Sequence, residues 1–281
     1  MPQKPKAPRR RPTPAELDAE ADALARLAAD KTLISGVYNY CDRWCERCPL
    51  TARCLVFKTE RARDAKHGRV RPDLENKEFW DELGHSFAVA MHMVMRDAKK
   101  LGVNFDDENE RAAVEVEERQ RRRLAARQGS ALHRAATAYW KSAQRLLERL
   151  APELKETEQI LNTQLRLGAG RPEADAAEIR DALEVVQWYL FFIDVKLQRA
   201  VSSRVATQRE GDDGYPSDAD GSAKVALIAI DRSIAAWARL RGHLIAEGDA
   251  MLDLLVQLER LRRATEREFP KARAFERPGF D

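Results

Sequence analysis

The sequence has few glycines, no long apolar run, and cysteines in one place only. Glycine accounts for 13 of 281 residues, and there is no glycine-rich phosphate loop of the P-loop or dinucleotide-binding type. Nor does any Ser or Cys stand in a recognisable nucleophile motif. The longest apolar run, Val185–Ile193, is interrupted by Gln187 and is too short to span a bilayer. With no visible signal peptide, we expect a cytoplasmic protein that does not enter a membrane.

What the chain does contain favours helix nearly throughout. Ala, Leu, Arg and Glu dominate the composition, and these residues have high helix propensity. An apolar share of 44% in 281 residues is enough for a substantial core. We therefore predict an all-α protein, a multi-helix bundle with an N-terminal loop whose cysteines hold a metal or cluster.

The composition divides the chain into four segments. Residues 1–13 form a basic, proline-rich tail expected to be disordered, residues 14–72 a helical segment with the cysteines, residues 73–269 a helical bundle domain, and residues 270–281 a C-terminal tail. The tail contributes five Lys and Arg residues to a net charge of +3, so the remaining chain is close to neutral at −2. Nucleic acid is a possible partner of the tail and an unlikely one for the body.

All four cysteines lie in one stretch of fourteen residues, CDRWCERCPLTARC. Cys41, Cys45, Cys48 and Cys54 are separated by three, two and five residues, so four thiols fall within reach of one centre. On a helix the first three would be at i, i+4 and i+7 and would share one face. Pro49 suits the first turn of a second helix, which would carry Cys54.

The spacing also discriminates between metals. Structural zinc usually takes its ligands as two short pairs with a longer spacer between them, whereas iron–sulfur clusters more often take closely consecutive cysteines. We therefore expect a four-iron four-sulfur cluster held by Cys41, Cys45, Cys48 and Cys54, with zinc as the alternative. Disulfides are the poorest interpretation, since loops this small constrain the unfolded chain little.

The ten residues Cys45–Cys54 carry a resemblance to a known family. Their C-x2-C-x5-C pattern resembles the cluster loop of helix-hairpin-helix DNA glycosylases, where it supplies three ligands of a four-iron four-sulfur cluster. In that family six residues separate the first two cysteines, and here three separate Cys41 from Cys45. No glycine-rich hairpin between helices follows, so the family's DNA-binding and catalytic parts are not expected here.

The first three cysteines match a second pattern. Cys41, Cys45 and Cys48 form a C-x3-C-x2-C run that resembles the cluster motif of radical S-adenosylmethionine enzymes. Those enzymes leave one iron open and build a barrel of strands and helices. Cys54 offers a fourth ligand here, and strands are hard to find in this sequence.

Residues 74–101 predict an amphipathic helix. A core face is expected from apolar side chains that recur at helical spacing: Trp80, Leu83, Phe87, Met91, Val94 and Ala98. The opposite side is expected to be solvated, because it carries polar groups at similar spacing: Glu78, Glu82, His85, His92 and Arg96.

Within that polar side, Glu82 and His85 form a Glu-x-x-His step. Ferritin-like carboxylate proteins use such steps to hold two metal ions in a helix bundle. A second site at Glu82 and His85 would need carboxylates from another helix, such as Glu184 or Asp231, because no second step is present.

The remaining pattern predicts further helices and one clear loop. Helices are expected near 14–29, 55–67, 105–128, 152–168, 173–208 and 249–269, with two more that begin at Ser130 and Ser222 and run through Leu147 and Trp237, and with a loop over 209–221. The longest, 173–208, is apolar on all sides at its centre and should lie inside the bundle.

Three functions remain open from the sequence. The first is a redox or electron-transfer protein with an iron–sulfur cluster, working with an unknown redox or protein partner. The second is an interaction protein, possibly associated with nucleic acid, in which zinc or a cluster is structural. The third is a ferritin-like dimetal oxidase using Glu82 and His85. Whether the protein is an enzyme is left open.

Overall fold

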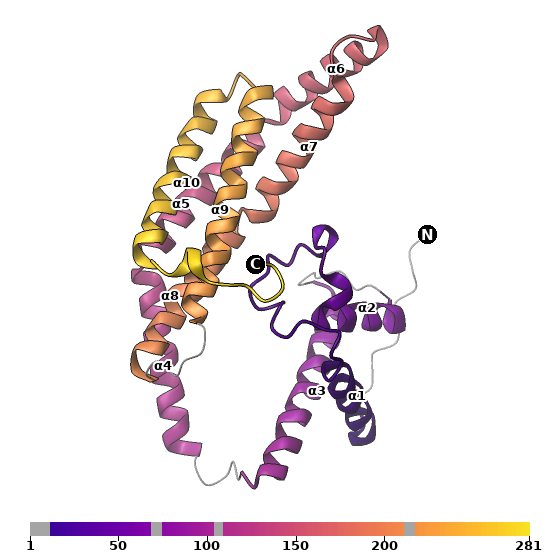
Figure 1. The fold of residues 1–281 in the computed structure, drawn as a ribbon, viewed down its shortest axis with the longest axis vertical. Helices are drawn as coiled ribbons and strands as arrows, with labels where there is room; N and C mark the ends of the chain where they lie inside the picture. The colour runs from indigo at the N-terminus through magenta and orange to yellow at the C-terminus, as the bar shows by residue number, and fades with distance from the viewer. Residues whose placement is uncertain (1–11, 69–74, 104–108, 211–216) are drawn as a thin grey trace. The chain divides into compact units, whose positions relative to one another are not determined.

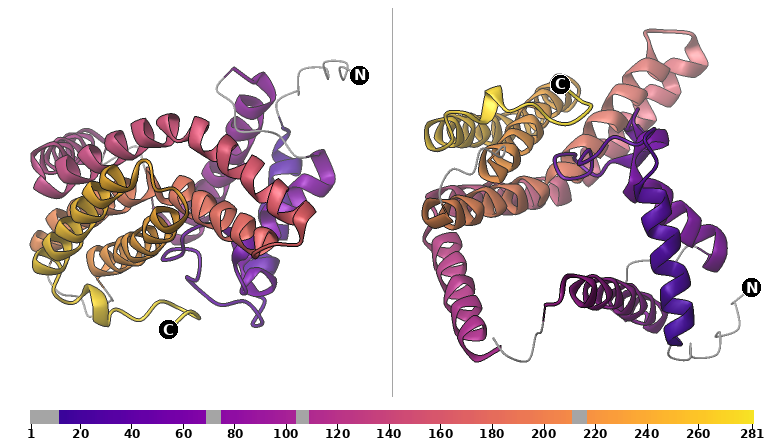
Figure 2. Two further views of the ribbon diagram at one scale, coloured as in Figure 1. Left: turned by 90° about the horizontal axis from the view of Figure 1, so that it is seen from above. Right: turned by 60° about the horizontal axis from the view of Figure 1, so that its bottom comes forward.

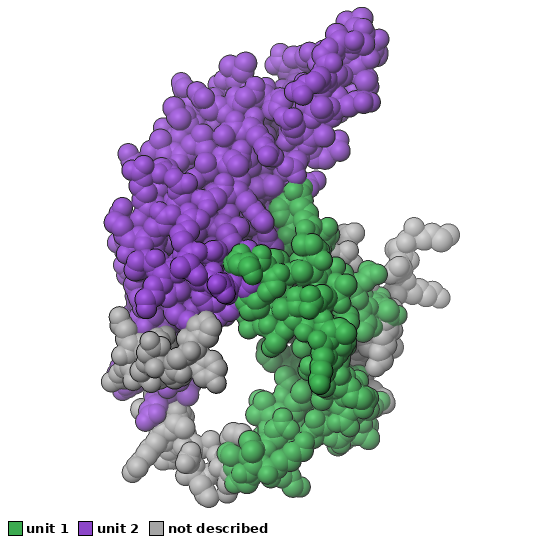
Figure 3. Space-filling model, in the orientation of Figure 1, with its two compact units in different colours: residues 1–39, 43–114, 278–281 green, residues 40–42, 115–277 purple. Residues whose placement is uncertain are grey.

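The computed structural model describes residues 12–68, 75–103, 109–210 and 217–281, and every regular element in these ranges is a helix (Figure 1). The predicted all-α class is therefore confirmed. The chain forms two compact units (Figure 3). The first unit comprises residues 1–39, 43–114 and 278–281, and the second comprises 40–42 and 115–277. The sequence-based boundary near residue 72 differs from this division, because the helix after it belongs to the first unit.

Apart from the first residues of α4 (Asn109–Gly129), the described part of the first unit contains three α-helices and two short 3₁₀ turns. They are α1 (Pro14–Ala28), η1 (Cys45–Arg47), η2 (Thr51–Arg53), α2 (Leu55–His67) and α3 (Lys77–Leu101). The helix expected near residue 14 begins with a capping box formed by Thr13 and Glu16. Thr13 Oγ1 accepts a hydrogen bond from Glu16 N at 3.3 Å, and Glu16 Oε2 accepts one from Thr13 N at 2.8 Å.

Helices α2 and α3 end at glycines with positive φ, as C-terminal glycines commonly do. Gly68 has a φ of +82° and Gly102 a φ of +69°. Asn76 caps the start of α3 by accepting a hydrogen bond from Glu78 N at 3.0 Å. The helix start that the sequence indicates at Pro72 and Asp73 lies outside the described residues.

The two faces of α3 are exchanged relative to the prediction. Its polar side contacts α1: His85, His92 and Arg96 bind acidic side chains of that helix at 2.6 to 2.7 Å. Its expected core face is largely exposed, including Phe87 and Met91. The prediction was wrong because hydrophobic periodicity shows that a helix has two faces, whereas ion pairs with α1 decide which face is covered in this unit.

The second unit contains the larger helical assembly. Its elements are the C-terminal part of α4 (Asn109–Gly129), then α5 (Ala131–Arg149), α6 (Ala151–Leu167), α7 (Pro172–Tyr189), α8 (Phe192–Glu210), α9 (Asp218–His243), α10 (Gly248–Glu268) and η3 (Ala272–Ala274). In Figures 1 and 2, α6 and α7 form an antiparallel pair that extends beyond the other helices of this unit. None of the described helices of either unit has the length and apolarity needed to cross a membrane.

Helix α9 is the centre of the second unit. It packs against α7, α8 and α10, as the three views in Figures 1 and 2 show. Many of its buried residues are small, which lets neighbouring helices approach closely, while Trp237 fills the space near its C-terminal half. Trp237 Nε1 donates a hydrogen bond to the hydroxyl of Tyr139 on α5 at 3.0 Å, and both side chains are fully buried.

Two predicted boundaries in the second unit were wrong. The helix expected over 173–208 is two helices, α7 and α8, separated at Leu190 and Phe191. The helix expected to begin after Ser222 begins at Asp218, because Ser217 is its N-cap and accepts a hydrogen bond from Asp220 N at 3.3 Å. Aspartates in the first turn stabilise a helix N-terminus. Asp218 and Asp220, which the sequence pattern assigns to a loop, therefore form the first turn of α9.

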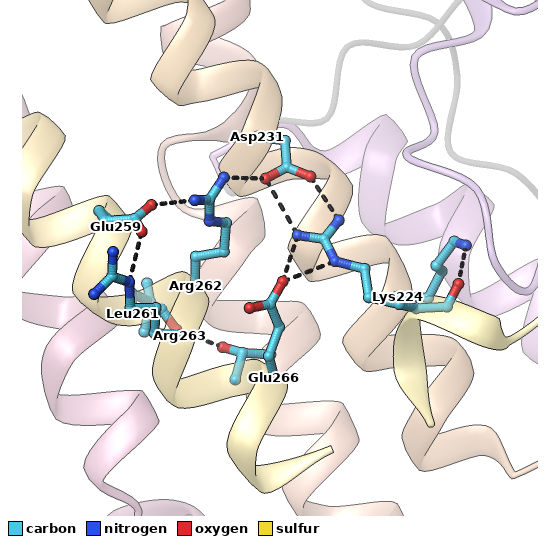
Figure 4. Close-up of polar contacts among 9 residues, drawn as sticks. Lys224, Asp231, Glu259, Leu261, Arg262, Arg263 and Glu266 are labelled. Atoms are coloured by element: carbon cyan, nitrogen blue, oxygen red, sulfur yellow. Dashed lines mark hydrogen bonds and ion pairs between the residues drawn. The ribbon is translucent and has the colours of Figure 1, made fainter. Parts of the chain in front are cut away.

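An ion-pair network joins α9, α10 and η3 (Figure 4). Asp231 on α9 lies 2.6 Å from Arg273 Nη1 and 3.5 Å from Arg262 Nη1. The two arginines also pair with acids of α10, Arg262 with Glu259 and Arg273 with Glu266. Through Arg273, these ion pairs hold the C-terminal segment against α9 and α10. The sequence pattern assigns this segment only to a tail.

Candidate metal centre

The cysteine loop between α1 and α2 has a defined conformation built from two short turns. Turn η1 ends at Cys48, whose N–H donates to Cys45 O at 3.2 Å, and η2 ends at Cys54, whose N–H donates to Thr51 O at 3.3 Å. Cys48 and Cys54 have similar extended backbones, with φ/ψ of −87°/124° and −106°/118°. An Arg-Cys pair thus closes each turn, six residues apart.

The prediction that three cysteines share a helix face was wrong. Arg43, between Cys41 and Cys45, has a φ of +60°, in the left-handed region that a right-handed helix excludes. Cys48 precedes Pro49, and a residue before proline is driven to extended conformations by the proline ring. These two positions interrupt any helix through the loop, so the thiols depend on turn geometry for their directions.

The segment Tyr40–Asp42, which carries Cys41, belongs to the second unit and is held on both sides of the cysteine. The Tyr40 ring packs edge-on against Phe275 with centroids 4.7 Å apart. Asp42 Oδ2 lies 2.6 Å from the Tyr189 hydroxyl and 2.6 Å from Arg232 Nη1. The backbone next to Cys41 is therefore anchored by side chains from α7 and α9.

Tyr189 acts as a hydrogen-bond donor to Asp42. Burial raises the pKa of the Tyr189 hydroxyl, and the adjacent Asp42 carboxylate raises it further by hydrogen bonding and by charge, although Arg232 opposes this. The hydroxyl therefore stays protonated. Nearby, Trp188 Nε1 donates to the Asp42 carbonyl at 3.1 Å. Sequence reasoning missed these partners because they lie nearly 150 residues or more from Asp42, and no local pattern connects them.

The other three cysteines lie in the first unit, and none of the four is in a disulfide. The N–H of Leu50 points to Cys48 Sγ at 3.4 Å. Trp44 is buried beside the turn, and the Arg47 guanidinium stacks 4.0 Å from the centroid of its ring. All four cysteines are partly exposed, so they are accessible as well as ordered.

Further backbone contacts hold the loop in the first unit. Ile34 N donates to Arg53 O at 2.9 Å, and Arg53 Nε donates to Thr32 O at 3.1 Å. Gly279, with a φ of +76°, packs on the loop so closely that a Cβ there would lie 2.7 Å from Ile34 Cδ1 and 3.4 Å from Leu50 Cδ1. Gly279 thus packs against Ile34, which lies before the cysteines, and against Leu50, which lies between Cys48 and Cys54.

The chemistry of the donor set fits an iron–sulfur cluster or zinc, because both take thiolate sulfur. Across the described ranges, no group of three or more His, Cys, Asp or Glu side chains is arranged to hold a metal ion. What the structure does provide is an ordered loop, two cysteine-terminated turns and a backbone N–H directed at a sulfur atom.

The Glu82 and His85 step occupies the side of α3 that meets α1 and α2. Glu82 is buried, and its Oε2 lies 3.8 Å from Arg63 Nε on α2. His85 Nε2 lies 2.6 Å from Glu20 Oε2 on α1. In the second unit, Asp231 binds arginines as described above, and Glu184 lines a groove of about 720 Å³ between α6 and α7.

No protein-family model, curated protein or solved structure matches this chain. The class of the protein therefore rests on its own residues, which define an all-α protein with a cysteine loop between its first two α-helices.

Proposed function

We propose that the protein binds an iron–sulfur cluster through Cys41, Cys45, Cys48 and Cys54 and serves in electron transfer. The observation that carries the proposal is the loop itself, with four cysteines inside fourteen residues and two successive turns that each end in a cysteine. Closely consecutive cysteines are the usual ligands of such clusters.

Backbone N–H groups near the sulfurs support the negative charge of a thiolate-ligated cluster. Leu50 N–H already points to Cys48 Sγ, and hydrogen bonds to sulfur are one of the means by which proteins adjust cluster potential. Cys54 is the N-cap of α2 and makes no side-chain capping hydrogen bond. The first N–H groups of α2 therefore face the region of Cys54 with the positive end of the helix dipole.

Basic and aromatic side chains around the loop support the same function. Arg43, Arg47 and Arg53 belong to the loop, and their positive charge suits the net negative charge of a cluster held by four thiolates. Trp44 and Val37 are buried and supply an apolar surface beside the turns. A bound cluster supplies one-electron chemistry. Four protein ligands leave no iron open to a substrate. We therefore expect the cluster to pass electrons to a redox partner and not to turn over a substrate.

The test is metal and sulfide analysis after anaerobic purification. We expect about four iron and four sulfide per chain, with a visible band that changes reversibly on reduction. Cys48→Ser should lose most of both. Thr51→Ser, in the same loop but without a thiol, should keep them. Iron-free, colourless protein from both wild type and Thr51→Ser would refute the proposal.

A second function is an interaction protein in which the cysteines hold structural zinc. It is favoured by the exposed apolar face of α3, because several large apolar side chains exposed together mark a site where another protein binds. Zinc at about one per chain without sulfide or colour would assign the loop to this class.

A further inference from the structure

One face of α3 presents large apolar side chains to solvent. The exposed fractions are 49% for Trp80, 67% for Phe87, 62% for Met91 and 54% for Val94. The helix is well formed, with a capped start and a left-handed glycine at its end. Apolar side chains gathered this densely on one surface mark a contact site.

The spacing of this face is that of a coiled-coil seam. Trp80, Gly84, Phe87, Met91 and Val94 follow one another at steps of four, three, four and three residues. This alternation is the a/d pattern by which two helices pack along their length. The occupant that fits it is therefore another α-helix.

The seam is also free of charge, and it lies away from α1. The thirteen residues 83–95 include no Asp, Glu, Lys or Arg. Their two histidines, His85 and His92, bind Glu20 and Asp18 of α1. At 100° per residue these histidines point more than 90° from Phe87 and Met91, so α1 leaves the seam open.

We propose that the seam of α3 pairs with the same seam of a second copy of this chain in antiparallel orientation. With a two-fold axis near residue 89, Phe87 faces Met91 of the other copy, and Val94 faces Gly84 of the other copy. Larger side chains thus meet flexible or small ones, and the two copies use identical surfaces, as a two-fold dimer requires.

The charges at the ends of α3 select the antiparallel orientation. Its first six residues carry a net charge of −2, from Glu78, Asp81 and Glu82 against Lys77, and its last six carry +2, from Arg96, Lys99 and Lys100 against Asp97. Antiparallel packing brings the basic end of one helix beside the acidic end of the other, whereas parallel packing brings like charges together. The helix dipoles also oppose one another favourably in this arrangement.

The test of association is sedimentation velocity on the full-length protein over a wide concentration range. We expect a concentration-dependent monomer–dimer equilibrium. Phe87→Glu should weaken dimerisation at least tenfold, because a charge enters the middle of the seam. The matched control is Leu167→Glu on α6, where Leu167 is 76% exposed and lies outside the seam. It should leave the equilibrium unchanged, and circular dichroism should show equal helix content in all three proteins.

The orientation is tested by cross-linking copies that carry a new cysteine at Trp80 or Leu101, with the products mapped by peptide mass. A mixture of Trp80→Cys and Leu101→Cys copies should form the 80–101 cross-link. Trp80→Cys alone should form no 80–80 cross-link, since those positions would be about 27 Å apart along the helices at 1.5 Å per residue. A monomer at every concentration, a dimer unaffected by Phe87→Glu, or a dominant 80–80 cross-link would each overturn the proposal.

Discussion

The ring of Tyr40 fills the space beside Gly221, so that a Cβ atom at residue 221 would clash with Tyr40 Cε1. The same Cβ would lie 2.7 Å from the tip of the Phe275 ring. A glycine near the start of α9 is therefore required by the residue that precedes Cys41. This contact links the core of the second unit to the conformation of the cysteine loop's first residue.

Gly221→Ala should destabilise the protein and loosen the segment around Cys41. Overpacking of this kind costs about 1–3 kcal/mol, and it outweighs the gain in helix propensity of about 1 kcal/mol. Denaturant unfolding measures the loss. Alkylation followed by peptide mapping should show faster modification of Cys41 than in the wild type.

The control for this variant lies in the same helix. Gly242 has no atom within 4 Å of the position of an added Cβ, so Gly242→Ala should be neutral or stabilising by up to about 1 kcal/mol. If Gly221→Ala were as stable as Gly242→Ala, the close approach of Tyr40 would not be a constraint on the fold.

The hydrogen bond between His85 Nε2 and Glu20 Oε2 should contribute to the docking of α1 on α3. Both side chains are about one-third exposed, so we expect a coupling energy of about 1 kcal/mol, above that of a solvated ion pair. A double-mutant cycle with Glu20→Ala and His85→Ala, measured by urea unfolding, gives this energy.

A comparison pair on α3 shows whether the coupling reflects helix docking. Lys77 and Asp81 form an ion pair within the helix at 2.9 Å, and its coupling should be below about 0.5 kcal/mol. Equal couplings for the two pairs would mean that His85 adds nothing to the contact between helices.

Alkaline pH should destabilise the second unit through Tyr139. Burial raises the pKa of Tyr139 to about 12 from an ordinary value of 10.0. Below pH 10 the hydroxyl is protonated in both states. Between pH 10 and 12 only the unfolded chain releases the proton, so stability falls by about 2–3 kcal/mol across this window. Phenolate absorbance should appear together with unfolding.

Tyr139→Phe separates this effect from the other tyrosines. The variant should be less stable at neutral pH by about 1–3 kcal/mol, because Trp237 Nε1 loses its buried acceptor. Its further loss between pH 10 and 12 should be smaller than that of the wild type. An identical alkaline loss in both proteins would remove Tyr139 as a cause.

Acid should release α1 from α3. The hydrogen bond from His92 is the largest contribution that holds the pKa of Asp18 below its ordinary value of 3.8, with the charges of His92 and Arg96 adding to it. A lowered carboxyl pKa gives stability that is present above 3.8 and disappears as pH falls through the lower folded value. Hydrogen exchange of residues 14–28 should therefore accelerate below about pH 4. In Asp18→Asn this acid step should be reduced.

Local signals in the sequence were sufficient for many helix ends. The capping box at Thr13, the serine at Ser130 and the stop at Gly168 all lie where the structure has them. These signals work because a cap satisfies backbone groups within four residues of itself, and so it needs no distant partner. The break between α7 and α8 has no such signal, and the sequence pattern continued through it.

The cysteine loop shows the opposite case. The positive φ of Arg43 lies beside Asp42, which is held by Tyr189 and Arg232, and both of these residues are far away in the sequence. The local sequence was compatible with a helix through the cysteines, but the folded loop does not adopt one. The spacing of the cysteines along the chain identifies the four candidate ligands, whereas long-range contacts set the backbone conformation between them.

The sequence by itself determined the all-α class, most helix limits and the identity of the four candidate ligands, because propensity, capping and residue chemistry act within a turn or two of the chain. Only the tertiary structure decided which side of α3 is covered and how the segment Tyr40–Asp42 is held. Both depend on which distant charges and rings come together. Pairings of this kind are selected by the packed chain as a whole and leave no periodic trace in the order of residues.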